Sequence, residues 1–388
     1  MRIIYATTGL PHRRQNGGEI ATMNFIEALE ALGHEVEVVG YARLSTEAPV
    51  GRHIHSAGSW PIEMAEAGAR RYLWVARALV SGRPIINTKF ISRAYLRALD
   101  RARPQTADLL LIDHAHMGWV ADLPGMPAHR VFVAHNVETG LYGAVGTRTG
   151  GLMGLLYGRE GRLLAGLERH LVQSSAQTWV LSEDDRAGLI ALAGAPERFR
   201  VFDLPGQDLG AADAKAGAEP RYDIGMIGSW SWEINRRGVL WFVNEVLPLL
   251  PEGVSVAIAG AGSQTLPGDD SRLSRLGRVD DAGTFMRECA VLAVPTLVGS
   301  GVQLKTIEGI AIGRPLVATP LAMRGIAAAS EHVRVAETAQ SFAAALIEAR
   351  RAAPPPRAIG AEWIEARRSQ FKTTVAEALL ELANWGLT

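Results

Sequence analysis

Short apolar runs alternate with stretches of helical spacing along the chain, and the clearest case lies between residues 291 and 326. The order there is an apolar run, a glycine break, a helical pattern and a second apolar run, at 291–295, 299–301, 302–312 and 315–319. Short apolar runs bounded by turn residues are typical of buried strands, and a period of 3.6 residues is typical of helices. The pattern therefore predicts a strand, a glycine turn, a helix and a second strand.

The first half of the chain repeats this order of elements. An apolar run at 2–7 precedes a loop rich in glycine and proline, an amphipathic stretch at 20–32 and a second apolar run at 36–41. Further apolar runs lie at 108–113, 131–134, 178–181, 222–227 and 254–259. Strands that alternate with helices are typical of α/β proteins with parallel sheets, so we predict two doubly wound, Rossmann-like domains.

The boundary between the two domains is predicted where the apolar pattern is lost. Residues 206–220 are rich in glycine, alanine and aspartate and have no apolar period, which is typical of a linker. We therefore expect an N-terminal domain at 1–205, a C-terminal domain at 221–357 and a terminal helical region at 358–388. A chain of 388 residues is long enough for two packed cores.

The composition excludes several classes of protein. The chain has no net charge and an isoelectric point near 7.2, so its overall charge does not favour nucleic acid as a partner. Cys289 is the only cysteine, which excludes an intrachain disulfide framework and a cysteine-based zinc cluster. The first apolar run is too short for a signal peptide, and no run reaches the roughly 18 residues of a membrane helix. These features predict a cytoplasmic protein.

One segment departs from the overall charge balance. Residues 68–104 contain nine basic side chains and a single acidic one, Asp100, with aromatic and aliphatic residues between them. A basic amphipathic helix can lie on an anionic membrane surface, where each nearby cation contributes about 1 kcal/mol. Two core-facing helices with arginine-rich outer faces would have the same composition. The basic residues are Arg70, Arg71, Arg77, Arg83, Lys89, Arg93, Arg97, Arg101 and Arg103.

The glycine turn before the helix at 302–312 offers a site for an anion. Unpaired backbone N–H groups and the helix dipole favour a negative charge at a helix N-terminus, where phosphate is a common ligand. Lys305 and Glu308 are three residues apart, so their side chains lie on one face of this helix. A cation for a phosphate and a carboxylate for sugar hydroxyls would suit a nucleotide sugar. The alternative is an ordinary βαβ crossover with a solvated Lys–Glu pair.

The segment at 299–319 resembles the donor-site signature of GT-B glycosyltransferases of family four, in the subgroup of bacterial polysaccharide biosynthesis. The matching residues are Gly299, Gly301, Lys305, Glu308, Gly309, Ala311, Gly313, Pro315, Leu316, Val317, Ala318 and Thr319. The resemblance implies that Glu308 binds the ribose of the nucleotide. It also implies that Lys305 and the N–H groups near Val302 bind its diphosphate. Ser300 stands where many members of the family carry a further glutamate.

The resemblance extends to the start of the predicted second domain. Gly228 and Ser229 follow the strand at 222–227, in a segment similar to the diphosphate-binding loop of the family. Ser229 takes the place of an arginine found in other members, and Arg237 is the nearest candidate for a lysine found there. The resemblance therefore assigns diphosphate binding to Arg237 together with the lysine of the donor-site signature.

Two segments of the first half also resemble the family. Gly17 and Gly18 begin the first predicted helix, followed by Glu19, and in the family this glycine loop faces the reaction centre and the acceptor. His135 follows the strand at 131–134, where family members carry a histidine that contacts the transferred sugar. The resemblance thus adds His135 to the catalytic residues implied by the donor-site signature.

Two patterns are compatible with other ligands. His114 and His116 follow a strand and could bind a metal, but no third ligand is near in sequence, so a polar strand end is the simpler interpretation. Gly260 and Gly262 begin a dinucleotide-like motif that lacks its third glycine and the following acidic residue, so we expect no NAD. The chain contains no Asp-x-Asp triplet. We therefore expect no metal and no cofactor, with the nucleotide sugar as substrate.

The resemblance implies the GT-B fold, with two Rossmann-like domains facing a cleft and a last helix that crosses back to the first domain. It further implies a metal-independent, retaining hexosyltransferase that moves a sugar from a UDP- or GDP-linked donor to a glycan acceptor. The basic segment at 68–104 favours a polyprenyl-linked acceptor in exopolysaccharide or lipopolysaccharide assembly, on the inner face of the cytoplasmic membrane. Two alternatives are a GT-B nucleotide-sugar epimerase and a degenerate GT-B subunit that supports a partner without catalysis.

Overall fold

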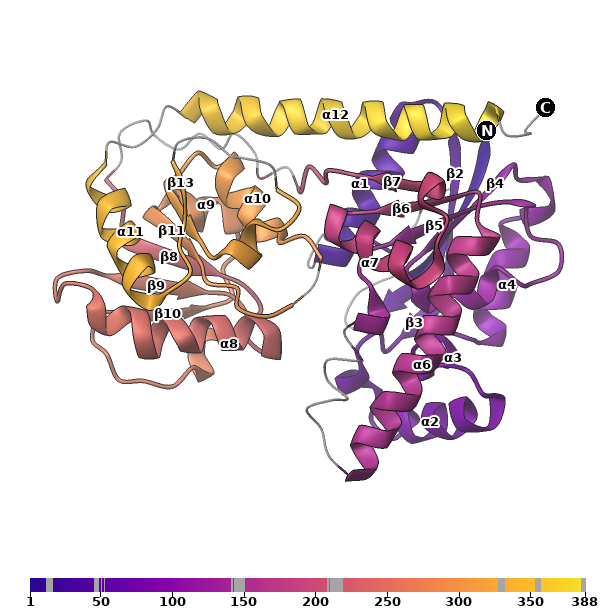
Figure 1. The fold of residues 1–388 in the computed structure, drawn as a ribbon, viewed down its shortest axis with the longest axis horizontal. Coiled ribbons are helices and arrows are strands. Elements are labelled where there is room, and N and C mark those ends of the chain that lie inside the picture. The colour runs from indigo at the N-terminus through magenta and orange to yellow at the C-terminus, as the bar shows by residue number, and fades with distance from the viewer. Residues whose placement is uncertain are drawn as a thin grey trace. The chain divides into compact units, whose positions relative to one another are not determined.

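The predicted order of strands and helices occurs in a computed structural model of the chain (Figure 1). The structure describes residues 1–11, 17–44, 49, 51, 53–140, 142, 151–207, 209, 219–299, 301–326, 332–352 and 357–384. It divides into two units, and each is described by itself. Unit 1 comprises Met1–Phe202 and Phe371–Thr388, and unit 2 comprises Asp203–Gln370. The C-terminal helix α12 (Arg357–Asn384) contributes residues to both units.

The division into units lies close to the end of β7 (Phe199–Val201), at residues 202 and 203. The segment that follows belongs to unit 2, because Arg367 of α12 donates a hydrogen bond to the carbonyl of Leu204 at 2.6 Å and lies 3.3 Å from the Asp203 carboxylate. Of the predicted linker at 206–220, residues 208 and 210–218 lie outside the described part of the chain.

Unit 1 is built on a seven-stranded sheet in which neighbouring strands are parallel, in the order β3-β2-β1-β4-β5-β6-β7. Helices lie on both faces of this sheet (Figure 1). Its central strands are therefore buried on both sides, which explains why their sequences are continuous apolar runs. Every residue of β4 is buried. The strands are β1 (Arg2–Gly9), β2 (Glu35–Arg43), β3 (Ile54–Trp60), β4 (Leu109–Asp113), β5 (His129–Ala134), β6 (Gln177–Val180) and β7 (Phe199–Val201).

An aromatic cluster joins the helices of unit 1 to its sheet. The ring of Phe25 in α1 lies 5.4 Å from Trp179 in β6 and 5.1 Å from Phe371 in α12, between ring centroids. These contacts anchor the second half of α12 on unit 1. The helices of unit 1 are α1 (Gly17–Ala31), α2 (Arg70–Ser81), α3 (Ile85–Thr88), α4 (Arg93–Arg101), α6 (Gly151–Ser174) and α7 (Glu183–Ala193), with the short helices η1 (Met64–Ala67), η2 (Pro104–Thr106), η3 (Ala115–Val120) and η4 (Pro196–Arg198).

Unit 2 has a six-stranded parallel sheet in the order β10-β9-β8-β11-β12-β13, again with helices on both faces. The α/β class predicted from the sequence is thus confirmed in both units. The strands are β8 (Tyr222–Ile227), β9 (Val256–Ala259), β10 (Leu273–Gly277), β11 (Cys289–Val294), β12 (Leu316–Ala318) and β13 (Val333–Val335). The helices are α8 (Glu233–Trp241), η5 (Phe242–Val246), η6 (Leu247–Leu249), η7 (Ser263–Thr265), α9 (Ala282–Arg287), α10 (Leu304–Ala311), η8 (Pro320–Met323) and α11 (Ala339–Arg351).

Backbone segments at the carboxyl edge of the unit 2 sheet approach one another closely, and this approach requires glycine both in a loop and in helix α8. A Cβ atom on Gly260 would lie 2.0 Å from the carbonyl oxygen of Gly228, and one on Gly238 would lie 1.8 Å from that of Pro295. Gly260 also has a φ of 109°, a backbone conformation that residues with a Cβ atom rarely adopt. These contacts bring the ends of β8 and β9 together and place α8 against the end of β11, at the edge where α/β sheets bind ligands.

Strands β8 and β11 are equally close at Gly225, which faces Cys289. A Cβ atom on Gly225 would lie 2.2 Å from the sulfur of Cys289. The thiol is buried and donates to the carbonyl of Phe285 at 3.2 Å. Burial raises the pKa of Cys289 to about 12. The side chain therefore behaves as a small apolar group that fills the space left by the glycine.

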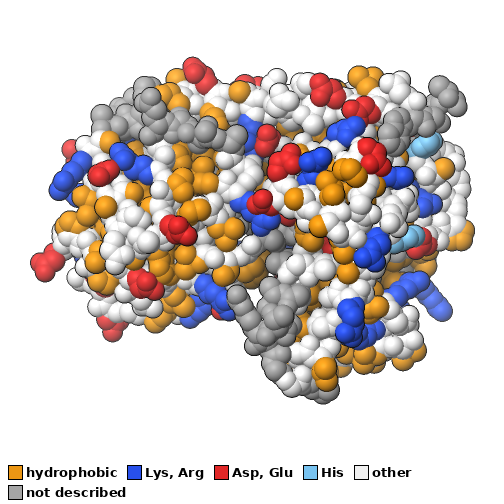
Figure 2. Space-filling model, viewed as in Figure 1, with side chains coloured by type: hydrophobic (Ala, Val, Ile, Leu, Met, Phe, Trp, Pro, Cys, Tyr) orange, Lys and Arg blue, Asp and Glu red, His pale blue; other side chains and the backbone are white. Residues whose placement is uncertain are grey.

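Helix α2 exposes apolar side chains next to arginines. Only Trp74 and Ala78 are buried in this helix, whereas Leu73 is 58% exposed and Val80 is 90% exposed. Figure 2 shows hydrophobic and basic side chains next to one another on this part of unit 1. The outer face of α2 thus carries apolar side chains, whereas the outer face of a core-facing helix is usually polar.

Lys89 differs from the other basic residues of the segment at 68–104. It is buried, lies over the rings of Trp74 and Phe90, and donates a hydrogen bond to the carbonyl of Ile62. Burial lowers the pKa of Lys89 to about 8. The eight arginines of the segment are exposed, so they carry its surface charge and Lys89 does not.

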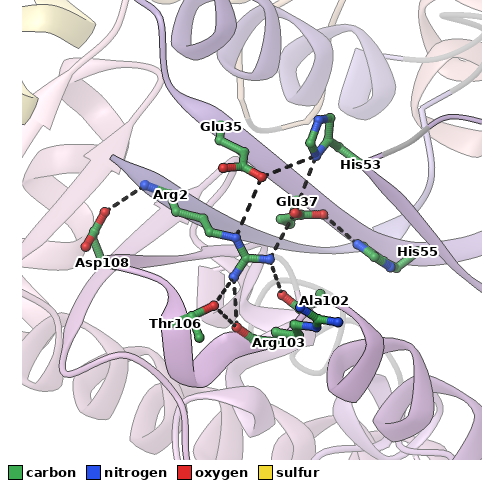
Figure 3. A network of polar contacts seen from close by, with 9 residues as sticks. All are labelled: Arg2, Glu35, Glu37, His53, His55, Ala102, Arg103, Thr106 and Asp108. Atoms are coloured by element: carbon green, nitrogen blue, oxygen red, sulfur yellow. Dashed lines mark hydrogen bonds and ion pairs between the residues drawn. The ribbon is translucent and has the colours of Figure 1, made fainter.

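A network of polar side chains closes the amino edge of the unit 1 sheet (Figure 3). Arg2 donates to Glu37 at 2.9 Å and to the carbonyl of Ala102 at 2.8 Å, and His55 lies 2.6 Å from Glu37. Burial alone would raise the pKa of Glu37, but hydrogen bonds with His55 and Arg2 hold it below its ordinary value. Glu35, Glu37 and His53 each also have an atom that could bind a metal ion, and these three atoms lie within 4.8 Å of one another. Because Arg2 contacts both carboxylates, their charge is partly balanced without a metal ion.

We expect Glu37→Gln to reduce the free energy of unfolding by about 1–3 kcal/mol at pH 7, since a buried charged hydrogen-bond network is lost. Folding lowers the pKa of Glu37, so its contribution is present above the unfolded pKa and is lost as the pH falls through the folded one. Urea denaturation at pH 7 and pH 3 measures this difference. Glu35→Gln, in the same network but half exposed, should change stability by less than about 0.5 kcal/mol. Equal effects of both variants would contradict the prediction.

Candidate active site

The turn between β11 and α10 has the geometry of an anion-binding helix start. Gly299 and Gly301 have φ values of 133° and 73°, which glycine adopts without strain. Gln303 precedes the first turn of α10 and its side chain does not cap the helix. The backbone N–H groups of the first turn of α10 therefore receive no hydrogen bond from the side chain of its N-cap residue. Ser300, predicted to belong to this turn, lies outside the described residues.

Lys305 lies in the first turn of α10 without a carboxylate partner among the described residues. Its Nζ atom is 3.2 Å from Oδ1 of Asn235 and 5.9 Å from the ring centroid of Trp230. Burial lowers the pKa of Lys305 to about 8. A cation held only by a neutral amide and an aromatic ring is available to an anionic ligand.

Glu308 lies one turn further along α10 and is almost completely buried, with 7% of its surface exposed. Its Oε1 atom is buried and has no hydrogen-bond partner among the described residues. Burial raises the pKa of Glu308 to about 7, although a hydrogen bond with the Gln207 side chain acts in the opposite direction. An unsatisfied buried oxygen costs free energy, so this position favours a ligand that donates hydrogen bonds.

Asn235 links the β8 loop to Lys305. Its Nδ2 atom donates to the carbonyl of Ser229 at 3.0 Å, while its Oδ1 atom accepts from Lys305. Arg237 is two residues further along α8, which is about 200° around a helix of 3.6 residues per turn. It is half exposed and pairs with Glu233 at 3.0 Å. Of the predicted diphosphate ligands, the structure thus joins Ser229 to Lys305 through Asn235 and leaves Arg237 in a surface ion pair.

In unit 1, the predicted sugar-binding His135 belongs to a network centred on Asp113. Asp113 is fully buried at the carboxyl end of β4. Its Oδ1 atom lies 2.7 Å from Nε2 of His135 and accepts from the Tyr5 hydroxyl at 3.3 Å. Its Oδ2 atom accepts from the Thr7 and Thr22 hydroxyls at 2.7 and 2.8 Å. Side chains from β1, α1, β4 and the end of β5 therefore meet at one carboxylate.

His114 and His116 are partly buried, and the pKa of each is lowered. Burial lowers the pKa of His114 to about 4, helped by the charge of His135, and lowers that of His116 well below its ordinary value. The rings of His114 and His135 stack, with centroids 3.7 Å apart. Burial would raise the pKa of Asp113, but the two neighbouring histidines and its hydrogen bonds hold it well below its usual range.

Asp113, His114 and His135 offer three metal-ligating atoms within 4.8 Å of one another. Two ligands of one zinc ion, each at about 2.1 Å, would lie about 3.4 Å apart in a tetrahedral site. Nε2 of His135 and Oδ1 of Asp113 are 2.7 Å apart, which is a hydrogen-bond distance. Both carboxylate oxygens already accept hydrogen bonds from other side chains. The arrangement fits a carboxylate–histidine pair better than a metal site.

The predicted acceptor-side residues lie at the start of α1. Glu19 is buried and its carboxylate lies 2.5 Å from Nε of Arg43, at the end of β2. Arg43 also lies 3.6 Å from Glu63. Gly17 and Gly18 are described, whereas the preceding residues 12–16 lie outside the described part of the chain. Glu19 therefore serves to hold the first turn of α1 against β2.

The candidate residues form two clusters, one in each unit. The predicted Lys305 and Glu308 join in unit 2 with Asn235 and Gln207, which were not predicted as site residues. The cluster in unit 1 contains Asp113, which was also not predicted. A polar residue at the carboxyl end of an apolar parallel strand is the signal that could have identified Asp113.

We expect Glu308→Gln to stabilise the nucleotide-free protein at pH 8 but not at pH 5. Folding raises the pKa of Glu308 from 4.5 to about 7, so its ionisation reduces stability as the pH rises through this range. A neutral amide removes this cost, which is at most about 3 kcal/mol. Thermal or urea unfolding at both pH values measures the effect. Glu348→Gln, at an exposed site on α11, should show no such difference. A loss of stability at both pH values would contradict the prediction.

Comparisons with known proteins agree with the geometry of both units. The family described as "Glycosyl transferases group 1" matches residues 221–351, and the "Glycosyl transferase 4-like domain" matches residues 16–205. No curated protein matches the chain in sequence.

Several solved glycosyltransferases have a similar fold. HepE of Anabaena, in complex with UDP-glucose, is 13% identical with a TM-score of 0.63, over 98% of this chain and 100% of that chain. WaaG, a glycosyltransferase of lipopolysaccharide biosynthesis, is 17% identical with a TM-score of 0.55, over 96% and 95%. The lipopolysaccharide outer core galactosyltransferase WaaB is 11% identical with a TM-score of 0.58, over 98% and 99%. With the GT-B fold of these structures and family matches in both halves, the chain belongs to the group 1 glycosyl transferases.

Proposed function

We propose that this glycosyltransferase takes its sugar from a nucleotide sugar bound at the start of α10. The proposal depends on one observation: Lys305 has no carboxylate partner among the described residues, and the nearby Glu308 has a buried oxygen without a hydrogen bond. A diphosphate would pair with the lysine, and ribose hydroxyls would donate to the glutamate. The UDP-glucose complex of HepE, which has a similar fold, supports this class of donor.

The proposed reaction breaks the bond between the sugar and the nucleoside diphosphate, so the site must stabilise negative charge on the leaving group. Lys305 supplies a cation, and the backbone N–H groups around Gly301 and Val302 supply hydrogen-bond donors. Arg237 could add a second cation if it left its ion pair with Glu233. Protein cations would then take the role that a divalent ion has in other glycosyltransferases, and the reaction would not require a metal.

We further propose that the transferred sugar contacts His135 and keeps its anomeric configuration. This rests on the resemblance of the sequence to family four. The start of α1, with Gly17, Gly18 and Glu19, would then border the acceptor. Closure of the two domains on donor binding is expected from the same resemblance, and solution scattering with and without nucleotide would detect it.

A thermal-shift panel with UDP, GDP, ADP and CMP tests the donor site. A nucleotide at about 100 times its dissociation constant should add roughly 2.7 kcal/mol to stability. We expect one nucleotide to stabilise the protein, and Glu308→Ala to abolish the shift because the ribose loses its carboxylate. Glu348→Ala, an exposed position in the same unit, should keep the shift.

The outcomes of this panel separate the alternative functions. A protein that responds to no nucleotide would be a non-catalytic GT-B subunit. If a nucleotide binds, release of free nucleotide from its sugar only when an acceptor is present indicates a transferase. Conversion of the nucleotide sugar without an acceptor indicates an epimerase.

We propose that the acceptor is lipid-linked and that α2 lies on an anionic membrane surface. The exposed apolar residues Leu73 and Val80 would enter the interface, while Arg70, Arg71 and Arg77 contact anionic headgroups. No helix in the described part of the chain is long and apolar enough to span a membrane. The proposal is therefore a peripheral attachment, at the inner face of the cytoplasmic membrane, in exopolysaccharide or lipopolysaccharide assembly.

An apolar groove beside α2 supports this assignment. It has a volume of about 430 Å³ and is lined by Ala76, Val80 and Ile91, with Arg77 and Arg83 among its polar residues. Apolar walls next to two cations match the chemistry of a hydrocarbon chain that carries a phosphate group.

The double variant Arg71→Ala/Arg77→Ala should weaken binding to phosphatidylglycerol vesicles about 30-fold, since each cation near the surface contributes about 1 kcal/mol. Co-sedimentation at low salt measures the partition, and phosphatidylcholine vesicles should bind neither protein. Leu73→Asp should also reduce binding. The control Leu380→Asp changes an equally exposed leucine on α12 and should not. Wild-type protein that ignores anionic vesicles would exclude the membrane proposal.

A further inference from the structure

The hydrogen bond with Asp113 determines which ring nitrogen of His135 carries a hydrogen atom. An ionised carboxylate only accepts hydrogen bonds, and its two oxygens offer about four lone-pair sites. Hydroxyl groups of Tyr5, Thr7 and Thr22 occupy three of these sites, and His135 Nε2 lies at the fourth, 2.7 Å away. Nε2 must therefore carry a hydrogen atom and donate a hydrogen bond to Asp113.

At a pH where the His135 ring carries a single N–H, this hydrogen bond leaves the other ring nitrogen with a lone pair. No hydrogen bond to Nδ1 of His135 occurs in the described part of the chain. The ring of His114 stacks on that of His135 at 3.7 Å and with an interplanar angle of 30°, which limits rotation of the ring. Nδ1 is therefore a hydrogen-bond acceptor of fixed direction at the carboxyl edge of the unit 1 sheet.

We propose that Asp113 is a positioning residue that holds His135 in the Nε2–H tautomer and so presents Nδ1 as an acceptor for a hydroxyl group of the transferred sugar. The identity of this ligand rests on the proposed function, whereas the tautomer itself does not. A neutral sugar has hydroxyl protons to donate to Nδ1. A carboxylate or phosphate group at the same position has none, so the pair would select a neutral sugar over an acidic one.

Asp113→Asn reverses this polarity while it keeps the shape of the side chain. The hydroxyls of Thr7 and Thr22 donate to Oδ2 and would retain the carbonyl oxygen of the amide as their acceptor. The amide nitrogen would then face His135 and donate to Nε2. His135 would have to carry its proton on Nδ1, where it could no longer accept a hydrogen bond from a sugar hydroxyl.

The deciding measurement is ¹⁵N NMR of histidine-labelled protein without ligand at pH 8.5, with His135→Gln to assign the resonance. We expect the Nε2–H tautomer of His135 in the wild type and the Nδ1–H tautomer in Asp113→Asn. The matched control is Thr22→Val, which removes another hydrogen bond to the same carboxylate but leaves His135 in contact with it. This variant should keep the Nε2–H tautomer. A wild-type His135 protonated on Nδ1, or no change in Asp113→Asn, would overturn the proposal even without an activity assay.

Calorimetry with UDP and UDP-glucose tests the role toward the sugar. Asp113→Asn should leave the affinity for UDP unchanged and remove the part of the UDP-glucose affinity that depends on the sugar. The rate of UDP release from UDP-glucose should fall about 100-fold, and the loss in Thr22→Val should be at least about tenfold smaller. Equal losses in both variants would indicate a structural role for Asp113 and would overturn the positioning role. Wild-type protein that binds none of the nucleotides tested would count against the proposed function but not against the tautomer.

Discussion

The close backbone packing at the carboxyl edge of unit 2 is the constraint on which its donor-site cluster depends. Gly260 and Gly228, and likewise Gly238 and Pro295, approach to distances that leave no room for a side chain. This packing sets the β8 loop beside the start of α10. Asn235 can then hold both the loop carbonyl and Lys305, which are far apart in sequence. Glycines, which have no side chain, thus determine where the ligand-binding side chains lie.

Buried charges are treated differently in the two units. In unit 1 the carboxylate of Asp113 has its hydrogen-bonding capacity filled by protein donors, so it is stable before any ligand arrives. In unit 2, Glu308 keeps an oxygen without a partner among the described residues, and the contacts of the Lys305 ammonium there are with a neutral amide and an aromatic ring. The first arrangement orients a side chain, whereas the second stores an unfavourable free energy that a ligand can relieve.

The fold was largely predictable from the sequence because the apolar runs of parallel strands are local patterns. The strand, turn, helix and strand predicted between residues 291 and 319 all occur, with α10 at Leu304–Ala311. The shared face of Lys305 and Glu308 was predictable for the same reason, since it follows from the helical period.

The parts of the site that could not be predicted depend on contacts between distant segments. Asp113 acquires its role only where β1, α1 and β5 meet at the end of β4, and no local pattern shows this meeting. Arg237 and Asn235 are two residues apart, and only the packing of α8 decides which of them faces Lys305. Lys89 lies in a segment whose other basic residues are exposed, yet the fold buries it against two aromatic rings.

The single thiol of the chain has a practical consequence for experiments on conformation. Cys289 is buried at the start of β11, where its sulfur faces Gly225 of β8, and its raised pKa leaves almost no thiolate at neutral pH. Maleimide reagents should therefore not modify the folded native chain. A cysteine introduced at one exposed position in each unit would accept spin or fluorescence labels without removal of the native residue. Distances between the two units could then be measured directly in solution.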